Sequence, residues 1–439
     1  MIKINVAGVD QIVMALIRQL RSGDVAQNNV TACRLMLRLL QDNHAWLLGF
    51  PMLVATVAYA FGRLVLDHSR VPELRTQESE LVVRLLRERF VECSMVGRDL
   101  VRMLQDVAKV PVFRDLWRDI MHRPRSISAQ FEGVEQLLRV PTPRMFLANR
   151  LTFEMESRLL FILEQLPAVG YSRNLMWFVH RYLSTPESES LVSDLIRYII
   201  GVFHPSNAVL ASNIVPRYVF LGGLLRFIRS QVVAANAKLA LFYDWLFYTP
   251  GADNIMSIEP GVLIIARSVD RYTYLTTSFI EFLGFAVDAY SPQLAPLMRK
   301  SVGLAMLDAV EKGVIPSIVP ICEHPKLDPS IRRHMQQLFP QLVPAAADQT
   351  QPPAGDEVDG DDSAIFDGIP PLDGSEPLLP AVADAPSPTG EDKDAVVVLP
   401  DPLTPQPPRK LPGLKTPVHL RATATAASLD PVSRMFQDE

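Results

Sequence analysis

The composition of the chain changes at Pro344, and this change limits what each part can fold into. Residues 344–439 hold 17 of the chain's 36 prolines and an acidic cluster. The members of that cluster are Asp356, Glu357, Asp359, Asp361 and Asp362. Such a segment buries too little apolar surface to offset the entropy that ordering would cost. Residues 1–343 read instead as a succession of amphipathic helices. The sequence therefore predicts a helical scaffold domain over 1–343 and a disordered, Pro-rich acidic tail over 344–439.

Apolar spacing defines one long helix in the first part of the chain. Apolar side chains recur there at steps of three and four residues, which places them on one helical face. These side chains are Val82, Leu86, Phe90, Cys93, Leu100 and Leu104. The pattern predicts a single helix from about Glu78 to Val107.

Start and stop signals predict further helices. Ser184 and Glu187 can form a capping box, or Thr185 can cap a helix with Pro186 in its first turn. That helix is expected to stop at His204, because the residue before a proline disfavours the helical conformation. Two more helices are expected over Ala234–Tyr248 and from Asp328-Pro329 to Phe339-Pro340.

Strand signals are weak throughout the chain. The one β-rich stretch, Gly261–Ile265, suits the start of a buried helix equally well. Sequential helix pairs stack into α-solenoids or irregular helical arrays. No repeat of fixed period is found. The predicted fold is all-α, an irregular HEAT-like helical array.

Charge and cysteine content narrow the functional classes. Residues 344–439 carry a net charge of -11, which leaves +6 on the remainder of a chain whose total is -5. A dedicated DNA-binding domain is usually more basic than that. Cys33, Cys93 and Cys322 lie far apart, which argues against a disulfide framework and against a CxxC zinc site. A reducing compartment, cytosol or nucleus, is the expected location.

The segment Trp46–Gly62 contains no charged side chain and approaches the length of a membrane span. Pro51 stands near its start, however, and Arg63 and Asp67 interrupt its continuation. The sequence therefore favours a helix that is apolar all round because neighbouring helices cover it. A membrane anchor is the alternative.

Motifs that carry chemistry are absent from the sequence. It has no phosphate-binding P-loop, no HExxH metal motif and no nucleophile elbow. His180, His204 and His324 are scattered near expected helix ends, where histidine is favoured by the helix dipole. We therefore expect no enzyme, and no catalytic, cofactor-binding or metal-binding residue.

Four arginines form a candidate partner-binding strip. They fall at helical spacing opposite the apolar face of the Glu78–Val107 helix, with Val91 and Met95 between them. The four are Arg84, Arg87, Arg98 and Arg102. A charged, Met-containing strip could dock an acidic partner. The alternative is a solvated face with local ion pairs, such as Arg102 with Asp106.

Several long strings of the helical part resemble one protein family. The first are LLRERF at 85–90, GRDLVR at 97–102 and LQDVA at 104–108. Others are YLSTP at 182–186, DLIRYI at 194–199, HPSN at 204–207, ANAKLALFYDWLF at 235–247 and HPKLD at 324–328. They keep their order and cover most of the helical part. The chain thus resembles the N-terminal half of the Integrator complex subunit 3 family, whose members also belong to the SOSS complex.

The resemblance implies an all-helical scaffold without catalytic residues, located in the nucleus and also in the cytoplasm. In the family, this half holds an OB-fold single-stranded-DNA-binding protein and a small third subunit in a sensor of DNA damage. The family protein also belongs to the Integrator assembly, which processes RNA, so other Integrator subunits are further expected partners.

The chain also departs from the family pattern. Family members usually have further helices before the equivalent of Met1. They also continue into a second helical domain where this chain has the predicted tail, which leaves the contacts of that domain open.

A second function class remains open. The net-positive helical part could bind single-stranded nucleic acid directly, whereas the resemblance implies mainly indirect contact. Phe242, Tyr243 and Trp245 could stack on bases, but aromatic side chains beside Leu239 and Leu246 are more often part of a core.

Overall fold

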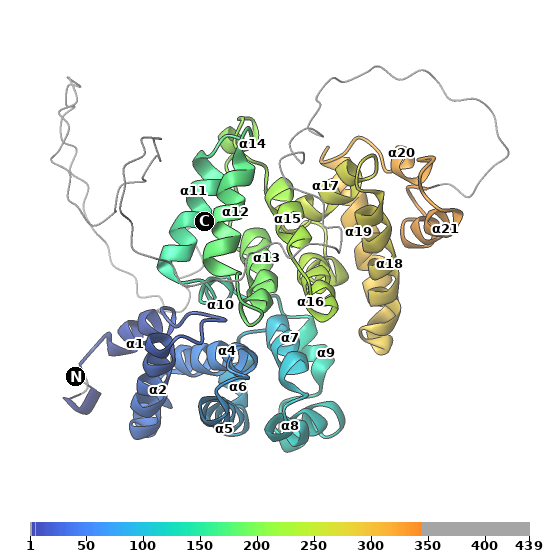
Figure 1. The fold of residues 1–439 in the computed structure, drawn as a ribbon. Coiled ribbons are helices and arrows are strands. Elements are labelled where there is room, and N and C mark those ends of the chain that lie inside the picture. The colour runs from blue at the N-terminus through green and yellow to red at the C-terminus, as the bar shows by residue number, and fades with distance from the viewer. Residues whose placement is uncertain (1, 5, 344–439) are drawn as a thin grey trace, which may run out of the picture. The chain divides into compact units, whose positions relative to one another are not determined.

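A computed structural model describes residues 2–4 and 6–343, and every structural statement below concerns these residues (Figure 1). Within them no β-strand forms, and the backbone makes only an isolated antiparallel bridge between Pro167 and Ile214. The prediction of an all-α fold is confirmed. The predicted tail and its acidic cluster lie outside the described residues, so the domain boundary at Pro344 stays a prediction.

The first helices pack around α4 (Pro51–Asp67), which contacts α1, α5, α6 and α7. Pro51 occupies its first turn, where the missing N–H costs nothing. Of its 17 residues 14 are buried, so the prediction of a helix covered on all sides is confirmed. The helix differs in extent from the apolar segment Trp46–Gly62, because Trp46 belongs to α3 and α4 continues through Arg63 to Asp67. No described helix combines the length and the apolar character that a membrane span needs. The other helices of this part are α1 (Val9–Ile17), α2 (Gln27–Asp42), α3 (His44–Leu47), α5 (Pro72–Glu88), α6 (Phe90–Ser94), α7 (Arg98–Val107) and α8 (Pro111–His122).

The predicted single helix over Glu78–Val107 is wrong, because the chain forms α5, α6 and α7 there. Its six apolar positions are all buried, so the face was identified correctly. The breaks fall at Arg89, with φ -138° and ψ 47°, and at Gly97, with φ 70° and ψ -145°. Gly97 is the N-cap residue of α7, whereas α6 already ends at Ser94.

In the middle of the chain, α13 (Leu191–Gly201) packs against α10, α15 and α16. Of the two predicted caps, Thr185 is the one that the structure shows: its hydroxyl oxygen accepts a hydrogen bond from the Ser188 N–H at 3.2 Å. The helix itself begins later than predicted, at Leu191, directly after the 3-10 turn η3 (Ser188–Ser190). The helix predicted over Ala234–Tyr248 begins earlier and ends at Phe242, and the 3-10 turn η4 (Trp245–Phe247) follows. The other helices are α9 (Val134–Leu138), α10 (Arg144–Ala148), α11 (Phe153–Gln165), α12 (Tyr171–Tyr182), α14 (Asn207–Leu210), α15 (Arg217–Arg226) and α16 (Gln231–Phe242).

The last described helices pack on one another, with α18 between α17, α19 and α21. The ambiguous stretch Gly261–Ile265 is helical. The predicted last helix is confirmed: the Asp328 carboxylate accepts a hydrogen bond from the Ser330 N–H at 2.7 Å and caps it, and it ends at Leu338. These helices are α17 (Glu259–Ser268), α18 (Thr273–Ala289), α19 (Ala295–Glu311), α20 (Val319–Cys322) and α21 (Pro329–Leu338).

Buried apolar side chains from Val9 to Val343 form one continuous core. Helices that follow one another in sequence pack together, as α4 does with α5, α17 with α18 and α18 with α19. This is the packing of an irregular HEAT-like array, in which each helix pair covers the apolar face of its neighbours.

Candidate functional site

Charged side chains meet in the core beside α7, where an apolar helix face would be expected. We call this set the α7 charge network. Its arginines, each only 2–6% exposed, are Arg63, Arg98, Arg102, Arg150 and Arg197. Its acids are Asp67 of α4, Asp99 and Asp106 of α7, Asp194 of α13, and Asp244 between α16 and η4.

Asp194 is the most connected acid of the α7 charge network. One of its carboxylate oxygens accepts from Arg102 Nη2 at 2.9 Å. The other accepts from Arg63 Nη2 and from Arg150 Nε, each at 3.1 Å. These three arginines come from α7, α4 and the loop before α11. One α13 carboxylate therefore ties together three segments that lie far apart in sequence.

Asp99 and Asp244 share the arginine that lies on the next turn of α13. Arg197 Nη2 lies 2.9 Å from Asp99, and Arg197 Nη1 lies 2.7 Å from Asp244. Asp99 also accepts from Arg102 Nε at 2.8 Å, and Asp244 from Arg98 Nη1 at 3.2 Å. Asp99 is fully buried and Asp244 is partly buried, and each has more than one opposite partner, which is the condition under which buried ion pairs are tolerated.

Burial and ion pairing act in opposite directions on these carboxyl groups. Burial alone would raise the pKa of Asp194, but Arg63, Arg150 and Arg102 outweigh it and hold the pKa well below its usual range. The same holds for Asp99, whose pKa Arg197 and Arg102 keep low against the effect of burial. For Asp67 burial prevails over Arg150, and the pKa is raised.

These shifts predict an acid-sensitive fold. A carboxyl whose pKa is lower in the folded than in the unfolded state stabilises the fold fully above its unfolded value, about 4, and loses that contribution as the pH falls. Asp67 has the opposite effect on the pH dependence of stability. Because its pKa is raised in the folded state, its protonated form stabilises the fold, and this contribution is lost as the pH rises. We expect Asp194→Asn to be less stable than the wild-type chain at neutral pH. Below about pH 4, the free energy of unfolding of the variant should fall less steeply with decreasing pH than that of the wild type, by roughly 1.4 kcal/mol per pH unit. Urea unfolding of both proteins across this pH range measures the two slopes, and equal slopes would exclude a low pKa for Asp194.

The structure separates the four arginines of the predicted strip. Arg98 and Arg102 are buried at 3% and 2% exposure, whereas Arg84 and Arg87 lie on the surface of α5. The prediction of one row along one helix is wrong, because α5 and α7 are separate helices. The alternative of a solvated face holds for Arg84 and Arg87, which are exposed. Its local Arg102–Asp106 ion pair is wrong, since Arg102 pairs with buried Asp99 and Asp194.

The exposed remainder of the strip is a mixed charged and apolar surface. Arg87 Nη2 bonds to Asp119 of α8 at 3.0 Å and remains 42% exposed. Val91 and Met95, in and just after α6, are 56% and 39% exposed. A role of this surface in partner binding stays a prediction.

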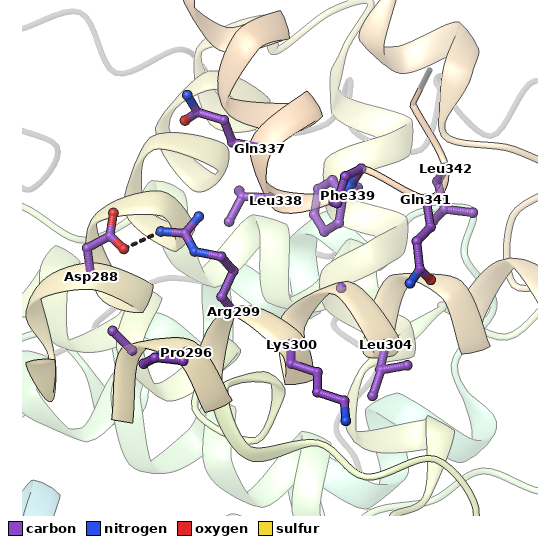
Figure 2. A pocket seen from close by; sticks show the side chains of 13 residues that line it. Asp288, Pro296, Arg299, Lys300, Leu304, Gln337, Leu338, Phe339, Gln341 and Leu342 are labelled. Carbon is purple, nitrogen blue, oxygen red and sulfur yellow. Dashed lines mark hydrogen bonds and ion pairs between the residues drawn. The ribbon is translucent and has the colours of Figure 1, made fainter. Parts of the chain in front are cut away.

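A pocket of about 510 Å³ lies between α19 and the end of α21 (Figure 2). Leu304, Leu338 and Leu342 form much of its apolar lining, as Figure 2 shows. The Asp288–Arg299 ion pair and Lys300 stand at its polar side. The pocket can bind a ligand that carries an apolar group next to a negatively charged group. No sequence signal predicted this pocket, because its residues come from separate helices and belong to no motif.

Other residues that the sequence singled out have structural roles. Phe242, Tyr243 and Trp245 are fully buried, so the interpretation as core aromatics is confirmed. His204 contacts the Ile200 carbonyl oxygen at 3.2 Å, and His324 Nε2 lies 2.9 Å from Asp270. Sequence analysis missed the α7 charge network, although GRDLVR and DLIRYI place an unusual density of charges in otherwise apolar helices.

Comparison with known proteins identifies a family. The family model described as Integrator complex subunit 3 N-terminal matches residues 1–337. The chain is 42% identical to Integrator complex subunit 3 of Pongo abelii over 345 residues, which are 78% of this chain and 33% of that protein. The same protein of Homo sapiens gives 42% over 346 residues, with the same two shares.

A more distant vertebrate gives a closely similar result. Integrator complex subunit 3 of Danio rerio is 42% identical over 354 residues, 80% of this chain and 35% of that protein. The chain thus spans about a third of the length of the curated relatives it matches. Because the family model covers almost all of the described helices, the chain belongs to the Integrator complex subunit 3 family.

Proposed function

We propose that the chain is a non-catalytic scaffold subunit of the Integrator complex. The observation that carries this proposal is the family match over residues 1–337, and the relatives are named as subunit 3 of that complex. A continuous core across many helices supports it, because such an array gives a rigid surface on which other proteins can assemble.

The absence of catalysis is part of the proposal. It is supported by the α7 charge network, where the central Asp194 carboxylate is already engaged by three arginines inside the core. The pocket of Figure 2 adds only an ion pair, Asp288 with Arg299, and Lys300 to an apolar lining. Neither arrangement has a nucleophile beside a general base, as acid–base or covalent catalysis requires.

We further propose that this helical part holds an OB-fold single-stranded-DNA-binding protein and a small third subunit, as a SOSS complex. That assembly would serve the DNA damage response and double-strand break repair, alongside the RNA processing of the Integrator complex. The location proposed is the nucleus, and also the cytoplasm. The strings that resemble the family support this, since they form α7, α13 and α16, which build the centre of the fold.

Co-purification tests the scaffold proposal. We expect the full chain to retain the OB-fold protein and the small third subunit of the same organism through size-exclusion chromatography, as one stoichiometric complex. Loss of both partners under low-salt conditions would contradict the proposal. The same complex should show no turnover of its own on nucleic acid.

Charge reversal tests whether Arg84 and Arg87 belong to the partner surface. We expect Arg84→Glu with Arg87→Glu to weaken binding of the OB-fold protein by about tenfold or more, since a buried interfacial charge pair contributes at least about 1.5 kcal/mol. Arg118→Glu is the matched control, because Arg118 of α8 is 56% exposed and pairs with its neighbour Asp115. Equal affinities of both variants, measured by calorimetry, would remove Arg84 and Arg87 from the interface.

Direct binding of single-stranded nucleic acid is the competing function. Burial of Phe242, Tyr243 and Trp245 removes the expected stacking surface and leaves that alternative with net charge alone. A salt titration separates the two, because phosphate contacts weaken steeply with salt. Tight, salt-sensitive binding by the isolated chain would favour the alternative.

A further inference from the structure

A thiol, an imidazole and a carboxyl group lie together where α2, α4 and α5 meet. Cys33 comes from α2, His68 follows the last residue of α4, and Glu78 comes from α5. One ligand atom of each lies within 4.8 Å of the other two. All three side chains are fully buried. Both α2 and α4 pack against α5, so the cluster sits at the junction of three helices.

The polar atoms of this cluster are only partly satisfied by the protein. His68 Nδ1 lies 2.8 Å from Glu78 Oε1. The second ring nitrogen, Nε2, and the second carboxyl oxygen, Oε2, are buried and have no hydrogen-bond partner among the described residues. An unsatisfied buried polar atom destabilises a fold, because it has lost its hydrogen bonds to water without replacement. Two such atoms next to a buried thiol indicate that the cluster serves a ligand, since a purely packed core would avoid this cost.

The surroundings of the cluster favour a cation. Glu78 is itself one of the three groups, and Asp67, the residue directly before His68, is buried as well, at 1% exposure. Two buried carboxyl groups therefore lie in or beside the cluster, and a positive ion there would balance their negative charge.

We propose that Cys33, His68 and Glu78 bind one divalent transition-metal ion, zinc. Thiolate, imidazole and carboxylate are the three side-chain donors that zinc takes in proteins. Donors on one zinc ion lie about 3–4 Å apart, so small side-chain rotations would suffice. A thiolate, a carboxylate and a neutral imidazole sum to two negative charges, which the ion neutralises in the core.

Binding would release the proton of the Cys33 thiol, because the thiolate is the form that holds the metal. The ion would then join α2, α4 and α5 and stabilise the fold. This structural role is independent of the partner proposed above. Sequence motifs could not reveal it, because the three donors are spread from Cys33 to Glu78 without a metal-ligand spacing.

The metal content of the full chain tests the proposal. We expect the protein, purified without a histidine tag or chelator and dialysed after addition of zinc chloride, to retain one zinc per chain by mass spectrometry. Cys33→Ser should retain less than a tenth of that amount. Cys93→Ser is the matched control, because Cys93 is equally buried but its thiol donates to the Leu85 carbonyl oxygen. It should retain the wild-type amount.

A cobalt titration keeps the proposal testable if Cys33→Ser fails to fold. The wild-type chain with cobalt chloride should develop the near-ultraviolet charge-transfer band of a cobalt–thiolate bond, at one equivalent. Zinc should abolish that band by displacement. A wild-type chain that retains no zinc and gives no such band would overturn the proposal, as would equal zinc in the Cys33→Ser and wild-type proteins.

Discussion

Replacing Asp194 by alanine is expected to lower the free energy of unfolding by about 3–5 kcal/mol. The substitution takes from buried Arg63, Arg102 and Arg150 one of the carboxylates that each contacts, here within 3.1 Å. Removing one partner of a buried ion pair costs far more than the pair contributes, because the remaining charge has no water to solvate it. Urea unfolding of the full chain, followed by circular dichroism, measures the loss.

Asp115→Ala is the matched control for this experiment. Asp115 pairs with Arg118 at 2.9 Å, but the two side chains are 74% and 56% exposed. Solvent screens such a pair, so we expect a change of at most about 0.5 kcal/mol. A loss below about 1 kcal/mol for Asp194→Ala would show that the α7 charge network does not hold the helices together.

A double-mutant cycle isolates the central contact. Arg102→Met removes the charge and keeps most of the side-chain volume. If Asp194 and Arg102 act on each other as their 2.9 Å contact indicates, the double variant should be more stable than the sum of the single losses predicts. We expect a coupling of about 1–3 kcal/mol. Strict additivity would mean that the two residues stabilise the fold separately.

Replacing Gly97 by alanine is expected to cost about 2–4 kcal/mol of stability. Gly97 has φ 70° and ψ -145°, a conformation that side chains with a Cβ strongly disfavour. A Cβ at this site would also lie 2.6 Å from the Val140 carbonyl oxygen and 2.9 Å from that of Pro141. The same Val140 oxygen accepts the Arg98 N–H at 2.9 Å, so the segment cannot move away without loss of that bond.

Gly284→Ala separates this effect from a general effect of glycine. Gly284 lies inside α18, and a Cβ there would meet no atom within 4 Å. Alanine has the higher helix propensity, so we expect a gain of about 0.5–1 kcal/mol. Thermal unfolding of the two variants should therefore move in opposite directions. A tolerated Gly97→Ala would indicate that the break between α6 and α7 is not required.

The sequence by itself predicted the elements whose signals are local. Asp328-Pro329 marks the start of α21 because a short acidic side chain and a proline satisfy a helix N-terminus within three residues. The apolar face over Val82–Leu104 was predicted because burial follows the helical period. The break at Gly97 was not predicted, because a glycine at helical spacing from apolar residues is equally compatible with a helix interior. At the break the Arg98 N–H donates to the carbonyl oxygen of Val140, which lies far along the chain.

The family was accessible from the sequence as well, since ungapped strings keep their order whether or not their contacts are known. The partners of the charged residues within those strings were not. Arg98 and Arg102 lie opposite the apolar positions when the segment is drawn as one helix, so they are expected at the surface. The cost of burying an isolated charge supports the same expectation. Only the tertiary structure brings Asp194 and Asp244, from distant parts of the chain, into contact with them.

The sequence therefore determined the helical class, the family and the covered apolar helix α4. Each of these depends on helical periodicity, on composition or on the order of matching segments along the chain. Tertiary structure alone decided which arginines are exposed and where the pocket at α19 and α21 lies. It also decided that Cys33, His68 and Glu78 meet. The physical reason is that these features come from contacts between helices distant in sequence, and no local propensity encodes such contacts.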